Sequence, residues 1–395
     1  MNIGMILDYT FPPDPRVENE AVALSNAGHD VYLFCLNYGD QPIEEHYKGF
    51  NVRRYKWNKF IYKLSALAYT VPFYHWYLQP RLNHFLKSNA IEAIHIHDIR
   101  IAQAVFNVSK KKLPIVLDLH DNMPEIMKLY PHLQKFPGKY IINPMAWKRR
   151  EEQFIKTADY VITVSQEFVE EVVERTSISP EKIRLVPNTV QQSFYKNAVI
   201  DDEIIDRFKD KFVLLYLGDT GLRRGLQTAI AAMPEILKTI PNAQLIIVGK
   251  NSTDHVLKAE AINLNLEDEV CFEGWQNVSL FPSYIKASDV CISPLKRNIQ
   301  HDVAYANKLF QYMSFERPLV VSNAIAQAKL IERTNTGLVH EEQNSKDFAS
   351  KIIALYNNEI LRKEMGVNGK AFIENEFCWE KTSETLVALY QNLKA

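Results

Sequence analysis

The residues best suited to bind a charged ligand lie in a glycine loop within the stretch FVLLYLGDTGLRRG at 212–225. Three of the chain's 13 glycines stand in this loop: Gly218, Gly221 and Gly225. Glycine lets backbone approach a ligand closely, and N–H groups at a helix start attract anions. Arg223 and Arg224 add fixed positive charge. The pattern favours a phosphate site; the alternative is an ordinary strand-to-helix turn with two solvated arginines.

A second helix start with a basic residue is predicted in HDVAYANKLFQYMSFER at 301–317. A loop leads to a helix near Asn307, and Lys308 stands in its first turn, where a helix N-terminus attracts anions. Leu309 completes the helix start, although its spacing is that of a core residue. Gln311 is the polar residue at a position that could face a cleft. We therefore treat this segment as a second part of the ligand site.

Polar residues follow two buried strands of the first half, Ala93–His97 and Ile115–Leu119. They are His97 and Asp98 at the end of the first strand, and Asp118, His120 and Asp121 at the end of the second. The carboxyl ends of parallel strands line the ligand crevice of open α/β sheets. His120 could orient a hydroxyl or a developing charge near neutral pH, and the alternative is a hydrogen-bonded structural histidine.

The loop TFPPDPR at 10–16 follows the first predicted strand and contributes one cation, Arg16. Its position at a strand's carboxyl end makes Arg16 a candidate ligand-binding residue. The alternative is that the prolines merely stiffen the connection.

The elements that position these residues form two β-α-β patterns, in 3–36 and in 212–249. Such units build parallel, doubly wound sheets, and Gly249 ends the second strand of the second unit. We expect an α/β fold of two Rossmann-like domains that face each other across a cleft, with the ligand between their strand carboxyl ends.

The length of 395 residues fits two domains. We expect a first domain in 1–195, a second domain in 196–375, and a C-terminal helix in 376–395. The polar stretch Val190–Lys211 reads as the linker.

Composition is that of a folded protein, with 47% apolar and 24% charged residues and a net charge of −1. No nucleic-acid partner is expected from this balance. The charge is uneven, however: Lys48 to Lys156 holds 19 Lys/Arg against 7 Asp/Glu, or +12.

The four cysteines are widely spaced, without C-x-x-C, which favours free thiols in a reducing compartment and suggests no zinc site. The first residues lack a basic n-region and a long apolar core, so we expect no signal peptide and a cytoplasmic protein.

Trp57–Pro80 is unusually aromatic. Its uncharged part is too short and too polar to span a bilayer of about 30 Å. The apolar stripe favours core packing, but the basic neighbours Lys59 and Lys63 would also suit contact with an anionic membrane surface. Peripheral contact at the inner face of the membrane is therefore an expectation for the first domain.

With these residues in view, the chain resembles retaining glycosyltransferases of family 4, which have the two-Rossmann GT-B fold. The likeness covers nearly the whole length. Its motifs are FPPDPRV at 11–17, DLHD at 118–121, ADYVITVS at 158–165, VPNTV at 186–190, YLG at 216–218, RRG at 223–225, IIVG at 246–249, ANKLFQYM at 306–313 and ERPLVV at 316–321.

The resemblance implies transfer of a sugar, with retention, from a nucleoside-diphosphate sugar to a hydroxyl of a glycan or lipid-linked acceptor, in cell-surface polysaccharide or glycolipid assembly. By position, Arg224 matches the family's phosphate-binding basic residue, and His120 the histidine near the transferred sugar. Asn188 matches an asparagine at the domain junction, and Lys308 fits the diphosphate region. The resemblance also implies a metal-independent mechanism without a cofactor. It further implies that the domain in 1–195 binds the acceptor, that the domain in 196–375 binds the nucleotide sugar, and that the C-terminal helix in 376–395 packs back on the first domain.

Two positions depart from the family pattern. Asp219 stands where an arginine usually follows the strand-end glycine Gly218. Of the two usual glutamates, the second position is Gln311 and the first falls near Val303. Glutamine can still hydrogen-bond a ribose hydroxyl, without charge.

Two rival functions stay open. A non-catalytic nucleotide-sugar-binding subunit of a glycan-assembly complex is favoured by Asp219 and Gln311. An NAD-dependent oxidoreductase would share the α/β fold, but no G-x-G-x-x-G follows the first strand of either half.

Overall fold

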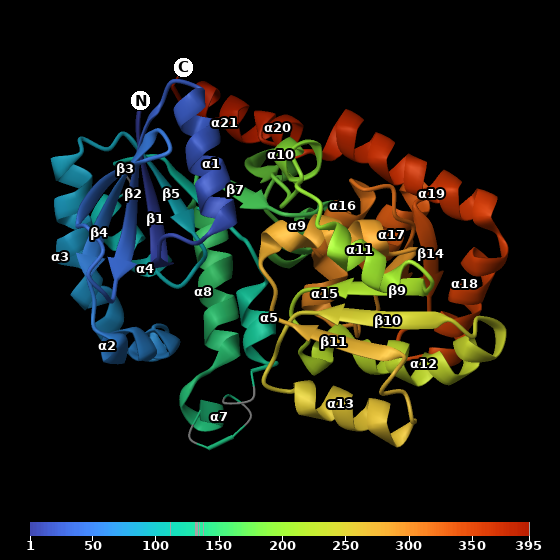
Figure 1. Ribbon diagram of the computed structural model, residues 1–395. Helices are drawn as coiled ribbons and strands as arrows, with labels where there is room; N and C mark the ends of the chain where they lie inside the picture. The colour runs from blue at the N-terminus through green and yellow to red at the C-terminus, as the bar shows by residue number, and fades with distance from the viewer. Residues whose placement is uncertain (111, 131–132, 134, 137, 395) are drawn as a thin grey trace. The chain divides into compact units, whose positions relative to one another are not determined.

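The computed structural model describes residues 1–394 except 111, 131–132, 134 and 137. It divides into two compact units (Figure 1). Unit 1 comprises Met1–Pro187 and Ser383–Ala395, and unit 2 comprises Asn188–Thr382. The division lies before the boundary expected after residue 195, and Asn188 begins unit 2.

Unit 1 contains a sheet in which every strand is parallel except β3, which pairs antiparallel with β4. Its order is β3-β4-β2-β1-β5-β6-β7-β8. The strands are β1 (Asn2–Thr10), β2 (Asp30–Asn37), β3 (Glu44–Tyr47), β4 (Phe50–Lys56), β5 (Ala93–His97), β6 (Ile115–Asp118), β7 (Tyr160–Thr163) and β8 (Ile183–Leu185).

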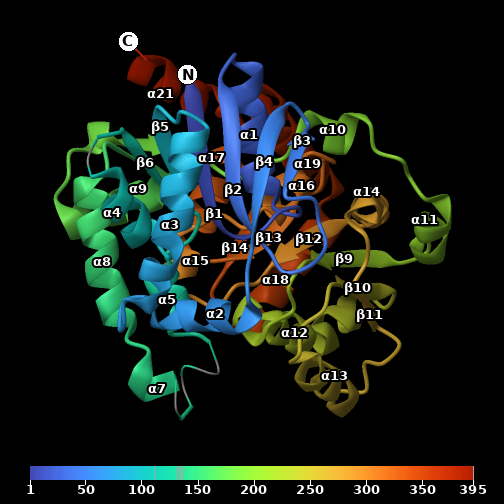
Figure 2. The same cartoon turned by 90° about the vertical axis from the view of Figure 1, so that its left-hand side faces the viewer.

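Helices connect and cover these strands. They are α1 (Pro15–Asn26), α2 (Lys59–Lys63), α3 (Phe73–Ser88), α4 (Ala102–Ser109), α5 (Met123–Met127), α7 (Gly138–Ile141), α8 (Pro144–Thr157), α9 (Gln166–Thr176) and α21 (Glu384–Lys394). In the aromatic segment, the stripe expected from helical spacing is divided into α2, a 3-10 turn at Leu64–Leu67 and α3 (Figure 2).

The register of the central strands sets the site of unit 1. Leu7 pairs with His97 across β1 and β5, and His97 pairs with Asp118 across β5 and β6. Parallel strands in this register end side by side, so the residues that follow them meet at one edge of the sheet.

Unit 2 contains a wholly parallel sheet in the order β11-β10-β9-β12-β13-β14. Its strands are β9 (Phe212–Leu217), β10 (Ala243–Val248), β11 (Val270–Gly274), β12 (Val290–Ser293), β13 (Leu319–Ser322) and β14 (Gly337–His340). Along β9, Leu214 and Tyr216 belong to one core cluster and Val213, Leu215 and Leu217 to another. Both faces of β9 are thus buried, which explains its continuous apolar run.

The helices of unit 2 are α10 (Gln192–Lys196), α11 (Asp202–Phe208), α12 (Leu226–Thr239), α13 (Asp254–Asn263), α14 (Phe281–Ala287), α15 (Ile299–Val303), α16 (Lys308–Met313), α17 (Ile325–Thr334), α18 (Ser345–Asn357), α19 (Glu359–Phe372) and α20 (Trp379–Thr382).

Three segments differ from the sequence-based expectations. The stretch 190–211 is not a plain linker, because it contains α10 and α11, and α11 buries Ile204 and Phe208. The loop expected before α16 contains α15, whose first turn is capped by Asn298. The single helix expected in 376–395 is two, α20 and α21. Apart from α21, these helices have four to seven residues, and a periodic signal is weakest in such short elements.

Candidate functional site

The glycine loop of unit 2, Gly218–Gly225, begins at the carboxyl end of β9. Gly218 has φ +111° and donates its N–H to the Val248 carbonyl oxygen over 2.8 Å. A Cβ added to Gly249 would lie 1.8 Å from the Gly218 carbonyl oxygen. Glycine at 249 is therefore required for two strand-end loops to pack backbone to backbone.

Asp219 holds both arginines of this loop. Its Oδ2 lies 3.4 Å from Arg223 Nη2 and 3.3 Å from Arg224 Nε. Its Oδ1 accepts hydrogen bonds from Asn251 Nδ2 (2.7 Å) and from the Gly221 N–H (3.2 Å). Burial opposes ionisation of Asp219, but the Asn251 hydrogen bond and the arginine charges outweigh it and lower its pKa.

This carboxylate is a feature that sequence reasoning missed. Asp219 appeared there only as the loss of a family arginine. In the structure it occupies an anion position that two arginines, an amide N–H and an asparagine converge on. The glycine loop therefore binds one anionic group of the chain itself, and the same donors suit a phosphate oxygen.

Lys308, the first residue of α16, is the third basic residue near Gly218. Its Nζ lies 3.4 Å from the centroid of the Tyr216 ring and has no hydrogen-bond partner within the described part of the chain. The residue is only 9% exposed. Burial, reinforced by the charge of Arg224, holds the pKa of Lys308 well below its usual range. An anion bound at the loop would supply the missing counter-charge.

The remaining predicted site residues of unit 2 differ in how exposed they are. Asn307 is exposed directly before α16, and Gln311 is half-buried within it. Leu309 has its side chain fully buried in the core, as its spacing predicted, and its N–H donates to the Ala306 carbonyl oxygen over 2.9 Å; its place in the ligand site stays a prediction. Leu309 is the second residue of α16, and its apolar side chain lies on the face of the helix that packs on the core, whatever ligand the helix N-terminus binds. Asn188 is half-buried next to Thr189, which contacts Thr382 rather than the glycine loop.

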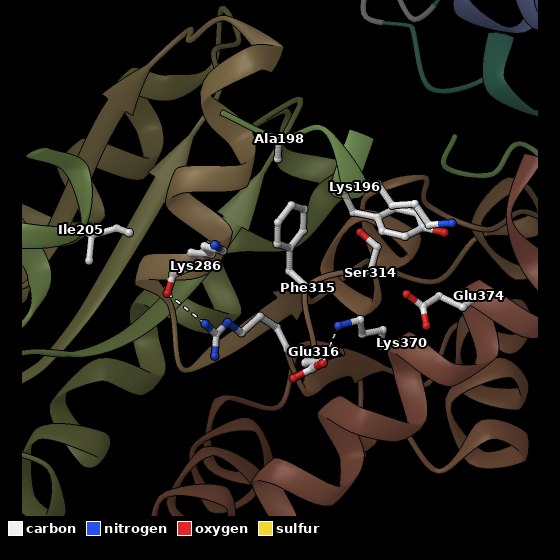
Figure 3. A pocket seen from close by; sticks show the side chains of 11 residues that line it. Lys196, Ala198, Ile205, Lys286, Ser314, Phe315, Glu316, Lys370 and Glu374 are labelled. Atoms are coloured by element: carbon white, nitrogen blue, oxygen red, sulfur yellow. Dashed lines mark hydrogen bonds and ion pairs between the residues drawn. The ribbon is translucent and has the colours of Figure 1, made fainter. Parts of the chain in front are cut away.

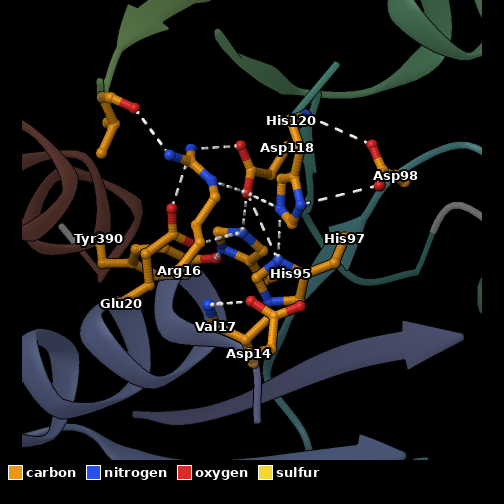
Figure 4. Close-up of polar contacts among 11 residues, drawn as sticks. Asp14, Arg16, Val17, Glu20, His95, His97, Asp98, Asp118, His120 and Tyr390 are labelled. Carbon is orange, nitrogen blue, oxygen red and sulfur yellow. Dashed lines mark hydrogen bonds and ion pairs between the residues drawn. The ribbon is translucent and has the colours of Figure 1, made fainter. Parts of the chain in front are cut away.

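In unit 1, Asp118 at the end of β6 is the centre of a buried polar network (Figure 4). Arg16 donates to it twice, from Nε to Oδ2 over 2.9 Å and from Nη2 to Oδ1 over 2.6 Å. The same guanidinium pairs with Glu20 at 2.9 Å. Arg16 was predicted to bind substrate, but its guanidinium is buried and engaged, so it positions Asp118 instead.

His120 also binds Asp118, with 2.6 Å between Nε2 and Oδ2 (Figure 4). Its Nδ1 lies 3.7 Å from Asp98 Oδ2. Burial disfavours the imidazolium, but the charges of Asp118 and Asp98 outweigh burial and raise the pKa of His120 to about 10. At neutral pH His120 is therefore a charged hydrogen-bond donor and not a free base.

Two further histidines complete the network; the sequence predicted His97 as a strand-end site candidate, but not His95. His95 Nε2 lies 3.2 Å from Glu20 Oε2, and its Nδ1 lies 3.0 Å from the Tyr390 hydroxyl of α21. His97 Nδ1 lies 3.0 Å from His120 Nε2. For His95 the only local signal was the pair of histidines two positions apart in a wholly buried strand.

The network has ligands for a metal ion but also has its own cation. Among the described residues, Glu20, His95, His97 and Asp118 offer atoms that all lie within 4.8 Å of one another. Arg16 is ion-paired with both carboxylates of this group. The residues therefore fit a guanidinium-neutralised structural core better than a cation site.

Beside this network a pocket opens at the carboxyl ends of β1 and β5, with a volume of about 220 Å³. We call it the strand-end pocket; its lining includes Asp8, Tyr9, Tyr62, Asp98, Arg100 and His120. His120 and Asp98, both predicted from sequence, meet here. Asp121 does not line it; its carbonyl oxygen accepts the Met123 N–H over 2.8 Å.

A separate cavity of about 640 Å³ lies in unit 2 beyond the carboxyl end of α16 (Figure 3). Two of its basic residues have partners: Lys370 Nζ lies 2.8 Å from Glu316, and Arg317 donates to the Ile285 and Lys286 carbonyl oxygens. Because Lys308 stands at the other end of α16, this cavity is distinct from the glycine loop.

Comparison with known proteins identifies the family. The model for Glycosyltransferase Family 4 matches residues 16–194, and that for Glycosyl transferases group 1 matches residues 200–372. An uncharacterized glycosyltransferase of Methanocaldococcus jannaschii is 22% identical over 94% of this chain and 92% of its own. The capsular polysaccharide biosynthesis glycosyltransferase CapM of Staphylococcus aureus is 23% identical over 53% of this chain and 51% of its own.

Among solved structures, Anabaena HepE in complex with UDP has a TM-score of 0.74 at 16% identity, covering 99% of this chain and 100% of that chain. At this identity the likeness establishes the fold, which confirms the expectation of two Rossmann-like sheets. The two family models between them account for most of both units, and the chain belongs to glycosyltransferase family 4, with the GT-B fold.

Proposed function

We propose that the protein is a retaining, metal-independent glycosyltransferase that moves a sugar from a nucleoside-diphosphate sugar to a hydroxyl of a glycan or lipid-linked acceptor. The observation that carries this proposal is the convergence of Arg223, Arg224 and the buried Lys308 beside Gly218. HepE, whose structure contains UDP, is similar over nearly its whole length, which supports a nucleotide ligand.

The chemistry asked of this cluster is stabilisation of a leaving group. As the bond from the anomeric carbon to the diphosphate breaks, negative charge grows on the diphosphate oxygens. Preorganised cations and N–H groups at that place lower the barrier most. In our proposal Arg223, Arg224 and Lys308 supply this charge without a metal ion or another cofactor. The acceptor oxygen bonds to the same face of the anomeric carbon, and its proton passes to the leaving diphosphate.

His120 has a binding role in this scheme. Because Asp118 and Asp98 keep it protonated, it donates a hydrogen bond into the strand-end pocket and does not take a proton. A charge-assisted donor of this kind is suited to hold a sugar hydroxyl. We assign His120 to the transferred sugar at the rim of this pocket, and the rest of the pocket and of unit 1 to the acceptor.

A membrane acceptor is supported by an exposed surface of unit 1, which we call the aromatic–basic surface. Its members are Phe60, Phe73, Trp76, Tyr140, Ile141 and Met145, with Lys59, Lys63 and Lys139 among them. Phe73, Trp76 and Tyr140 are 62%, 57% and 77% exposed.

Two segments far apart in the chain form this surface. Thr70 Oγ1 donates to the Ile141 carbonyl oxygen over 3.2 Å, and the rings of Tyr69 and Trp147 lie 4.8 Å apart. The 59–77 stretch contains no acidic residue. Exposed aromatics beside lysines suit the interface of an anionic bilayer, and none of the helices in the described residues has the length and apolarity to cross one. We therefore propose peripheral contact at the inner face of the membrane.

Flotation with vesicles tests this contact. Wild-type protein should float with vesicles that contain anionic lipid, less so at high salt, and not with neutral vesicles. The double variant Phe73→Ser, Trp76→Ser should lose flotation, whereas Val199→Ser, an exposed apolar residue of unit 2, should not. Equal flotation of all three proteins would contradict the assignment.

One observation favours a second candidate, a non-catalytic nucleotide-sugar-binding subunit. Asp219 already neutralises the arginines, which would weaken leaving-group stabilisation. A screen of nucleotide sugars by thermal shift, followed by transfer assays on membrane extracts in EDTA, separates the two. Turnover with product of the donor's anomeric configuration supports our proposal. Binding without turnover, for every donor, would favour the subunit.

A further inference from the structure

The strand-end pocket presents carboxylates that the fold itself has oriented. Asp8 accepts the Tyr74 hydroxyl at Oδ1. Asp98, with φ +61°, accepts the His120 N–H at Oδ1 over 3.3 Å. Each carboxylate is thus fixed by one donor of the chain, and both line the pocket. Preorganised acceptors of this kind suit a ligand rich in hydroxyl donors.

Asp8 lacks a second partner. The residue is 95% buried, and its Oδ2 accepts no hydrogen bond from any residue that the structure describes. Arg100 Nε lies 3.8 Å away, too far for a hydrogen bond. Burial outweighs the Arg100 charge and raises the pKa of Asp8 to about 6, so the group is ionised at neutral pH. A buried carboxylate oxygen without a donor is costly, and a ligand hydroxyl would satisfy it.

The two cations of the pocket are already engaged. Arg100 donates to the Tyr62 hydroxyl and pairs with Asp8. His120 is held between Asp118 and Asp98. An anionic ligand would therefore meet carboxylates and no cation that lacks a counter-charge, so it would be repelled.

The size and walls of the pocket suit one sugar ring. Its volume of about 220 Å³ is below the roughly 300–1,000 Å³ of pockets that hold drug-sized ligands. Tyr9, half-exposed, and Tyr62 both line it, with ring centroids 6.1 Å apart. Aromatic faces can pack against the C–H face of a pyranose while the carboxylates take its hydroxyls.

We propose that the strand-end pocket binds one uncharged pyranose ring of the acceptor, and that Asp8 is the residue that rejects a ring bearing a carboxylate or phosphate. This inference rests on the proposed glycosyltransferase function and specifies its acceptor. The ring's hydroxyls donate to Asp8 Oδ2 and to Asp98, and its apolar face lies against Tyr9 or Tyr62.

The test uses matched pairs of small glycosides and the full chain. Methyl gluco-, galacto- and mannopyranoside are each compared with the corresponding methyl uronate by ligand-observed NMR titration. We expect at least one neutral glycoside to bind at least tenfold more tightly than its uronate. Asp8→Asn should weaken the binding of that neutral glycoside about tenfold. It should also reduce the ratio of the uronate's Kd to the neutral glycoside's Kd. Tyr9→Ala should weaken the binding of the neutral glycoside severalfold and leave this ratio of Kd values unchanged. Asp30→Asn, at an exposed position, should change neither the affinity nor the ratio.

Several outcomes would overturn the inference. One is that no neutral glycoside binds, and another is that every neutral glycoside that binds has the same affinity as its uronate. A third is that folded Asp8→Asn has the same ratio of uronate Kd to neutral-glycoside Kd as the wild type. If Asp8→Asn does not fold, the wild-type ratio and the Tyr9→Ala titration still decide. Displacement of the glycoside by a nucleotide sugar, but not by the nucleoside diphosphate, would assign the pocket to the transferred sugar. Because binding is measured without turnover, these results are distinguishable from failure of the transferase itself.

Discussion

Replacing Asp219 by asparagine should make the protein bind nucleoside diphosphates more tightly. Asp219 Oδ2 lies 3.3–3.4 Å from Arg224 and Arg223, where a phosphate oxygen would otherwise be bound. Asp219→Asn keeps an acceptor oxygen for the Gly221 N–H and removes the negative charge. It therefore removes the group that competes with the diphosphate for both arginines.

The magnitude follows from the distances. A diphosphate on the same arginines would lie about 6 Å from the carboxylate, where two unit charges repel by about 2.8 kcal/mol at an effective dielectric constant of about 20. The Asp219 side chain is 32% exposed, so solvent screens part of this repulsion. Halving the value leaves about 1.4 kcal/mol, or a tenfold gain in affinity.

Isothermal titration of the wild type and of Asp219→Asn with UDP and GDP measures this gain. The control is Asp268→Asn, an equal change of charge that precedes β11 at the opposite edge of the sheet. We expect about tenfold tighter binding in Asp219→Asn and no change in the control. Unchanged or weaker binding in Asp219→Asn would refute the reasoning, because Asp219 would then be aligning the arginines and not competing for them.

Three further predictions concern the charged groups of the two units. Arg224→Ala should slow transfer about a hundredfold, or about 2.7 kcal/mol, and wild-type turnover would remove the leaving-group assignment. Diphosphate binding should draw a proton onto Lys308, whose pKa burial holds well below its usual range; calorimetry at pH 8 in buffers of different ionisation enthalpy should show uptake in the wild type and none in Lys308→Met. His120 has its pKa raised to about 10 from about 6.5, so its contribution to stability is complete below pH 6.5 and is lost as pH rises through 10. The difference in unfolding midpoint between the wild type and His120→Gln should shrink over that range, and a constant difference would count against the Asp118 pairing.

The central strands could be predicted from sequence because each is buried on both faces. Phe212–Leu217 is an uninterrupted apolar run, and the structure places it as β9 with the same bounds. The glycine loop could also be predicted, because glycines, arginines and the end of a strand stand together in the sequence. Local signals of this kind need no knowledge of the tertiary fold.

The networks could not be predicted because they join residues distant in sequence. The Tyr390 hydroxyl meets His95 across 295 positions, and Arg16 meets Asp118 across 102. Asp8 was passed over for the related reason that a residue's type does not reveal whether the fold buries it. Spacing indicates which face of an element a residue occupies, but the partner on that face comes from another element.

The most direct test of the account compares nucleoside diphosphate with nucleoside monophosphate binding by isothermal titration to the wild-type protein and to Arg224→Ala. The account predicts that one nucleoside diphosphate binds the wild type at least tenfold more tightly than its monophosphate and that Arg224→Ala loses this advantage. Equal affinity of the two nucleotides for the wild type would contradict the assignment of the glycine loop, Arg223, Arg224 and Lys308 to a diphosphate.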